Sequence, residues 1–339
     1  MPRFNTLTAL RVLGTALCFC LPLLFIGALP PEGEIEFPPE APFPSVYFTE
    51  YYERWIAYEA ARPYWAPTKL ENQSLAGYRR NSRPIFLNDD VLAFYGHPSS
   101  PNMGILGRFS LEELDVLLDG LAAEYDRANG ARGIRKALYL IYGTVHPRGE
   151  IGRIDDAELQ RYIRFAMEKD MLVFIDHQIG KYDPLTSLKE MLPYLQYRNV
   201  HLALDPEWRT DKPMRRIGSV TAEEINAAQE IMSRYLAEHR LPGERMLVIH
   251  QFDSRMIQDR EKVRSGYSQV TLVHCSDGFG SPALKRGTYG YNAQAKNMPV
   301  KGFKLFYNFN IPGAGYDEPL LEPEEVFQLN PRPALIMYQ

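Results

Sequence analysis

The stretch VHLALDPEW, residues 200–208, runs from five mostly apolar residues directly into two carboxylates and a tryptophan. In parallel barrels and open α/β sheets, the chemistry gathers at the carboxyl ends of the strands. If strand geometry continues past Leu204, the side chains of Asp205 and Glu207 lie on the same side. In the competing interpretation, Asp205 begins a turn with Pro206 and Glu207 is solvated. The stretch predicts a buried strand that ends in acid, and it leaves the role of the acids open.

Other short apolar runs recur along the chain, and nearly all of them end in a polar cluster. They lie at residues 91–95, 137–142, 171–175, 246–249, 270–273, 302–306 and 334–338. With the run that begins at Val200, they predict eight strands.

Helical segments are expected between many of these strands. Pairs of residues typical of helix starts occur at Ser110 with Glu113, Asp155 with Glu158 and Thr221 with Glu224. A further helix is expected over 184–195. Eight strands that alternate with mostly helical segments are the count of a closed barrel. We therefore expect residues 91–339 to form a single α/β domain, a (β/α)8 barrel of the TIM type.

The first 29 residues have the pattern of an export signal. Arg3 and Arg11 precede an apolar run over 12–29, and Gly27 and Ala28 supply small residues near its end. The run is also long enough to remain as a membrane anchor. We expect an exported protein that is periplasmic, anchored to the cell envelope or extracellular.

Two segments separate this signal from the barrel. Residues 30–45 are rich in proline and acidic side chains, which is typical of an extended linker. Residues 46–90 predict an N-terminal helix, over 46–61, followed by an irregular extension.

The composition excludes several classes of protein. The chain has 339 residues and a net charge of -4, and it has no basic cluster with interleaved aromatic residues, so we expect no nucleic-acid partner. Cys275 is the only cysteine outside the apolar N-terminal run, so the mature domain forms no internal disulfide. The sequence contains no glycine-rich phosphate loop after a strand and no Gly-x-Ser-x-Gly motif. No cofactor is predicted.

The strand ends of a barrel meet at one mouth, so their polar residues are expected to line one bowl. The candidate catalytic residues are Asp176, Asp205, Glu207 and Asp277. The candidate substrate-binding residues are His97, Tyr142, Gln178, Trp208, His250, Gln251, Phe252, Lys304 and Tyr307. The basic connection 209–220 follows the acidic pair and is long enough to fold over this bowl.

Glycoside hydrolysis is the chemistry that these residues favour. It needs one carboxylic acid that protonates the leaving oxygen and one carboxylate on the opposite side of the bond. Glu207 is the expected acid because its side chain is longer and lies beyond the strand end, and Asp176 or Asp277 is the expected partner. The many aromatic residues supply flat surfaces for sugars. We predict an exported hydrolase that acts on a glycan or glycoside.

Two alternatives remain open. A metal-dependent hydrolase would use histidine and carboxylate ligands at the strand ends. Five histidines lie there, namely His97, His146, His177, His250 and His274, but no His-x-His or His-x-x-x-His pair occurs. No metal ligand is therefore assigned. A non-catalytic barrel would bind a glycan or another small polar molecule in the same bowl without cleaving it.

Several runs resemble those of a group of exported bacterial proteins, often labelled lipoproteins, that have no assigned reaction. The runs are YGHP at 95–98, HLALDPE at 201–207, HQF at 250–252, DGFG at 277–280 and GFKLFY at 302–307. The resemblance covers residues 91–339 and implies an exported TIM barrel of glycosidase-like architecture, without catalytic roles. One large glycosidase clan has an Asn-Glu pair after the fourth strand, where this chain has Asp205-Pro206-Glu207.

Overall fold

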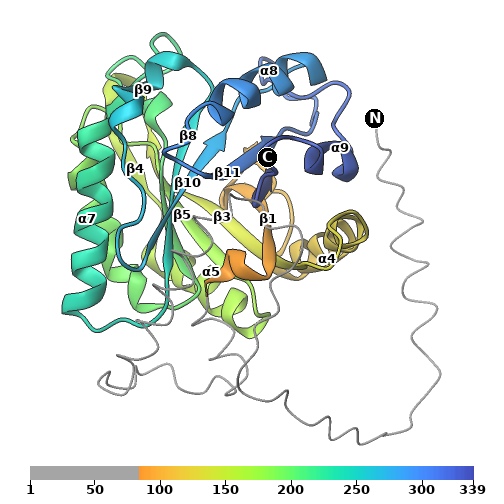
Figure 1. Cartoon of the computed structure of the whole chain (residues 1–339), viewed down its shortest axis with the longest axis horizontal. Coiled ribbons are helices and arrows are strands. Elements are labelled where there is room, and N and C mark those ends of the chain that lie inside the picture. Colours follow the sequence, from red (N-terminus) through yellow and green to blue (C-terminus); the bar gives the residue numbers. More distant parts are fainter. Residues whose placement is uncertain (1–83) are drawn as a thin grey trace, which may run out of the picture. The chain divides into compact units, whose positions relative to one another are not determined.

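The computed structural model describes residues 84–339 and contains a closed barrel of eight parallel strands (Figure 1). Each strand pairs with the next, and the last pairs with the first, where Ala93 lies opposite Met337. The strands are β1 (Asp89–His97), β3 (Gly133–Val145), β5 (Leu172–His177), β6 (Val200–Leu204), β8 (Arg245–Gln251), β10 (Val270–Ser276), β11 (Val300–Leu305) and β12 (Leu335–Tyr338). The predicted (β/α)8 barrel is confirmed.

Within residues 84–339, six helices cover the outside of the barrel, and Figure 1 shows α4 and α7 on opposite sides of it. The helices are α4 (Leu111–Ala128), α5 (Asp156–Glu168), α6 (Pro184–Met191), α7 (Ala222–Glu238), α8 (Pro282–Ala293) and α9 (Pro323–Phe327). The alternation is interrupted between β8 and β10, where residues 252–269 form short 3-10 turns and β9 (Ile257–Gln258).

The predicted helix starts owe their positions to side-chain caps. Ser110 and Thr221 each form the full reciprocal capping box, with Glu113 and Glu224 respectively. Asp155 also caps its helix by accepting backbone N–H groups. Its expected partner Glu158 binds Arg161 instead, at 2.6 Å.

Short strands extend the barrel ends. Strand β2 (Ser100–Gly104) is antiparallel to β1, and β4 (Ile151–Arg153) is antiparallel to β3. Strand β7 (Val220–Thr221) pairs in parallel with β9 in a separate two-stranded sheet.

Side chains alternate between the barrel interior and the helix layer. On β3, Leu138 and Leu140 pack into the apolar core that the helices share with the outer barrel surface. Tyr139 lies between them in sequence and stacks inside the barrel on Phe174, with ring centroids 4.9 Å apart. The main apolar core therefore lies between the strands and the helices.

Much of the N-terminal prediction lies outside the described residues. This holds for the export segment at 1–29, the linker at 30–45 and residues 46–83 of the extension. Within 84–339, no helix is long and apolar enough to cross a membrane. Strand β1 begins at Asp89, slightly before the predicted start, and buried Asp90 accepts hydrogen bonds from Arg132 and Arg332 at 3.0 and 2.7 Å.

Candidate active site

The acidic end of β6 combines features of both interpretations of residues 200–208. The strand ends at Leu204, and Asp205 caps a 3-10 turn over Pro206–Trp208 by accepting the Glu207 backbone N–H at 3.3 Å. The two side chains are therefore not held by strand geometry. Neither is fully solvated, because Asp205 is buried and Glu207 is partly buried. The turn places both carboxyl groups at the barrel mouth.

Four further strands bring charged side chains to the same mouth: Asp176 lies on β5, His250 on β8 and Lys304 on β11, and Asp277 directly follows β10. His250 Nδ1 lies 3.1 Å from Asp277 Oδ2, and His250 Nε2 lies 3.7 Å from Asp176 Oδ2. The ammonium of Lys304 donates to the same oxygen of Asp277 at 3.2 Å. With the two acids of the turn, these residues form what we call the mouth cluster. Its members are Asp176, Asp205, Glu207, His250, Asp277 and Lys304.

Two tyrosines complete the cluster, although neither was a predicted site residue. Tyr95 donates to Asp176 Oδ2 at 3.0 Å, and the Tyr139 hydroxyl lies 2.9 Å from His250 Nε2. The Lys304 ammonium also lies 3.8 Å from the centroid of the Tyr95 ring. Both tyrosines lie inside apolar runs, where an aromatic residue is usually part of the core. For Tyr95, the sequence feature that could have indicated a place in the site is its position near the end of β1.

For three members of the cluster, nearby charges shift the pKa in the direction opposite to the shift that burial causes. Burial alone raises the pKa of Asp277, but the charges of Lys304 and His250 outweigh it and hold this pKa well below its usual range. Burial disfavours the charged form of His250, yet its hydrogen bond with Asp277 and the charge of Asp176 raise its pKa well above normal. Burial likewise lowers the pKa of Lys304, and the nearby carboxylates outweigh this and raise it. Asp277 is therefore ionised between two cations.

The remaining carboxyl groups hold protons more tightly than usual. Burial raises the pKa of Asp205 to about 7. Burial, together with the charges of Asp205 and Asp277, raises the pKa of Glu207 to about 8. Burial also raises the pKa of Asp176, while His250 and Lys304 oppose this rise. The cluster has more carboxyl groups than cations, so Asp205 and Glu207 are the members that keep protons near neutral pH.

These shifts predict how stability depends on pH. In the folded protein, Asp205 and Glu207 bind protons more tightly than unfolded carboxyl groups, whose pKa is about 4. Their contribution to the free energy of unfolding is present below about pH 4 and is lost as the pH rises through about 7 to 8. Urea denaturation at about pH 5 and about pH 8.5 measures the loss. The double variant Asp205→Asn, Glu207→Gln should lose less stability than the wild type over this interval, and an equal loss would contradict the assignment.

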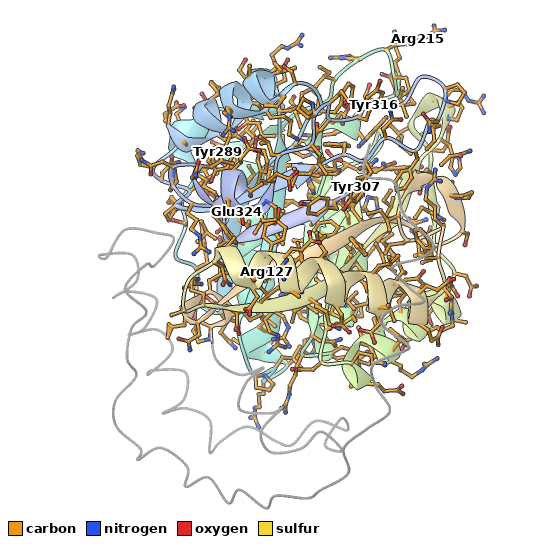
Figure 2. The ribbon with its side chains drawn as sticks, turned by 90° about the vertical axis from the view of Figure 1, so that its right-hand side faces the viewer. Arg127, Arg215, Tyr289, Tyr307, Tyr316 and Glu324 are labelled. Atoms are coloured by element: carbon orange, nitrogen blue, oxygen red, sulfur yellow. The ribbon has the colours of Figure 1, made fainter. Side chains whose placement is uncertain are left out.

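Several predicted binding residues make their contacts outside the mouth cluster. Tyr142 points into the helix layer, with its ring 6.0 Å from that of Tyr194. Gln251 contacts His274 at 2.8 Å and Asp253 at 3.1 Å. Tyr307 stacks on Tyr338, with centroids 5.1 Å apart. In Figure 2, Tyr307 lies above α4, the helix that carries Arg127.

The other predicted binding residues lie at the end of a strand or on the loops that follow the strands. Gln178 accepts the backbone N–H of Val145 at 2.8 Å, and the His97 ring accepts that of Ser99 at 3.1 Å. Trp208 ends the turn that carries Glu207, and its side chain is partly buried. Phe252 packs against Gly278, which follows Asp277. Of the predicted binding residues, His250 and Lys304 form ion pairs with the side chains of the catalytic candidates.

The five strand-end histidines do not converge. His177 lies beside Tyr142, and His274 contacts Gln251 and Lys301 on the outer side of the barrel. His146 lies next to Gly152 of β4. Among residues 84–339, no group of three or more histidine, cysteine or acidic side chains has the arrangement of a metal site. His250 is the histidine that reaches the mouth cluster.

No protein-family model matches the chain, and no curated protein matches its sequence. Among solved structures, an endo-β-1,4-glucanase of Xanthomonas axonopodis pv. citri is 9% identical, with 74% of this chain and 87% of that chain aligned at a TM-score of 0.41. A glycoside hydrolase family 5 enzyme of Prevotella bryantii is 9% identical over 79% and 91% of the two chains, at 0.40. A chitinase of Chromobacterium violaceum is 9% identical over 63% and 68%, at 0.34. The strand pairing, and not these distant alignments, establishes the fold.

Proposed function

We propose that the barrel hydrolyses a glycosidic bond, with Glu207 as the general acid. One observation carries the proposal: two carboxyl groups of the same mouth are held in opposite protonation states near neutral pH. Glu207 keeps its proton, while Asp277 is ionised beside His250 and Lys304. Environments that separate carboxyl pKa values in this way allow one group to act as the acid. The partner carboxylate must also have an oxygen that is free to reach the substrate or the water.

Each group has a part in the proposed reaction. Glu207 donates its proton to the leaving oxygen as the bond from this oxygen to the anomeric carbon breaks. Water supplies the hydroxyl that the sugar gains, and a carboxylate of the mouth accepts the proton that this water loses. Asp176 Oδ1 is buried and has no hydrogen-bond partner among residues 84–339. This oxygen is free to act on the anomeric carbon or on the attacking water. Both oxygens of Asp277 are already engaged, by His250, Lys304 and the Gly278 N–H.

The cations have a supporting part. His250 lies between Asp277 and Asp176, and Lys304 neutralises Asp277 from the neighbouring strand. Their charges favour ionisation of Asp176 while the acid on the turn remains protonated. This arrangement keeps a proton donor and a carboxylate in one small site.

The pH profile of activity tests the role of Glu207. Because its pKa is raised to about 8, the fraction that can donate a proton falls above this pH. We expect kcat/KM for a glycoside with a poor leaving group to decrease on the alkaline side with an apparent pKa of about 8, a value that belongs to the coupled pair with Asp205. Activity that keeps rising above about pH 9 would contradict the assignment.

A screen of the wild-type chain tests the reaction class. It uses nitrophenyl glycosides and hexasaccharides of glucose, xylose and N-acetylglucosamine, with release of nitrophenol or of new reducing ends as the readout. Hydrolysis of at least one compound is expected, and it should be lost in Glu207→Gln. A folded protein that binds a hexasaccharide but cleaves none of these compounds would be a binding module, which would contradict the proposal.

We also propose that this hydrolase acts outside the cytoplasm. The support is the apolar run at 12–29 behind two arginines. N-terminal sequencing of the protein from cell-envelope and medium fractions of the producing cell tests export. Recovery of the protein from the cytoplasmic fraction alone would contradict it.

A further inference from the structure

Three large apolar side chains are exposed beside the mouth cluster. Phe279 is 53% exposed, Leu284 59% and Tyr316 40%. The Phe279 ring lies directly on Gly315, so that a Cβ at Gly315 would overlap it, and Tyr316 is the next residue along the chain. Leu284 lies against Gly280, the residue after Phe279, where a Cβ would be 2.8 Å from its methyl group. Neighbouring exposed apolar residues are typical of a binding surface.

A buried ion pair holds the loops that carry these side chains. The Lys285 ammonium lies 3.3 Å from Asp317 Oδ2, and both side chains are almost fully buried. Asp317 accepts the N–H of Gly280 at 2.9 Å and that of Phe306 at 3.0 Å. Lys285 donates to the carbonyl of Gly278 at 2.6 Å.

This network fixes the backbone on both sides of Phe279 and next to Tyr316. The two rings are thus exposed to solvent while their loops are anchored below the surface. Binding to such a surface loses little loop entropy, which favours affinity. The same ammonium also donates to the carbonyl of Lys304, so the network joins the aromatic surface to the mouth cluster.

The surface begins where the proposed chemistry takes place. Asp277 is two residues before Phe279, and its Oδ1 accepts the Gly278 N–H at 2.7 Å. A ligand that reaches both regions has hydroxyl groups for the charged cluster and a flat, apolar face for the rings. A pyranose ring has both properties.

We propose that Phe279, Leu284 and Tyr316 form a stacking surface for a sugar ring next to the bond that is cleaved. The inference rests on the proposed function and extends it, because it assigns an oligosaccharide or polysaccharide chain as the substrate. In Figure 2, Tyr316 lies above Tyr307, on the same side of the barrel. A glycoside of a single sugar leaves this surface unused.

Binding to an inactive variant tests the inference. Full-length Glu207→Gln is titrated by calorimetry with cellohexaose, xylohexaose and N-acetylchitohexaose. We expect at least one to bind, and Phe279→Ala or Tyr316→Ala in the same background to weaken it about tenfold or more. Gly315→Ala retains every aromatic atom but displaces the Phe279 ring, so it should weaken binding as well. Val116→Ala on α4, at an apolar position that is also well exposed, is the control and should have no effect.

The outcomes separate this inference from the proposed function. Unchanged affinity in Phe279→Ala and Tyr316→Ala would overturn the stacking surface, and so would failure of all three hexasaccharides to bind. In either case, hydrolysis of a nitrophenyl glycoside by the wild type would leave the proposed function standing. If the affinity depends on Phe279 but the wild type hydrolyses nothing, the stacking surface would be supported and the proposed hydrolytic function would be contradicted.

Discussion

Replacing Glu207 with glutamine should lower kcat/KM for a glycan by about 10²–10⁴-fold, which is the usual contribution of a general acid. Glutamine has the same shape but no proton to donate to the leaving oxygen. The fold should be unchanged, and the free energy of unfolding should change by less than about 1 kcal/mol. Glu207 lies on a partly exposed turn and is already uncharged near neutral pH. Steady-state kinetics and urea denaturation measure the two quantities.

Glu150→Gln is the control for this substitution. Glu150 also lies on a loop that follows a barrel strand, and its carboxylate is 3.1 Å from Lys181 at the surface. The same chemical change there should leave kcat/KM unchanged. Equal activity of Glu207→Gln and Glu150→Gln would show that Glu207 is not the acid.

The substitution Asp277→Asn should destabilise the protein by about 3–5 kcal/mol, because it leaves buried cations without their carboxylate. His250 and Lys304 both contact Asp277 Oδ2, and all three side chains are almost fully buried. Asparagine fills the same space but cannot neutralise either charge. Urea denaturation at neutral pH measures the loss.

Asp253→Asn is the matched control for Asp277→Asn. Asp253 also follows a barrel strand, and a hydrogen bond from Arg255 lowers its pKa to about 2. This pair lies at the surface, where solvent screens the interaction, so its removal should cost about 1 kcal/mol or less. If both variants lost a similar free energy of unfolding, the claim that Asp277 neutralises two buried cations would be contradicted.

The barrel was predictable because its signals are local. Each strand is a short apolar run, and caps such as Ser110 and Thr221 mark the starts of helices within a few residues of chain. The 3-10 turns at 252–269 were not predicted, since this segment contains no comparable helix start. The helix α8 was also missed, although Ser281 caps it and Pro282 begins it.

The composition of the mouth was only partly predictable. Acids after strands indicated Asp176, Asp205, Glu207 and Asp277, but the side chains that reach them depend on which face of a strand points inward. Tyr139 and Tyr142 are an odd number of residues apart on β3, so they lie on opposite faces, and only the first enters the barrel. An apolar run does not reveal its inward face.

Contacts between loops that are distant in the chain could not be predicted from the sequence. The pairing of Lys285 with Asp317 joins α8 to the segment after β11, and no motif links the two positions. Similarly, Pro206 turns the chain directly after Asp205, so the geometry of the acidic pair depends on a turn that strand periodicity does not describe.

The most direct measurement compares two substrates that share one sugar and differ in the leaving group. A dinitrophenyl glycoside leaves readily without protonation, whereas a methyl glycoside or a glycan requires an acid. For Glu207→Gln, we expect kcat to stay within about tenfold of the wild type on the activated substrate and to fall by about 10²–10⁴-fold on the other. An equal loss on both substrates would contradict the role of Glu207 as the general acid.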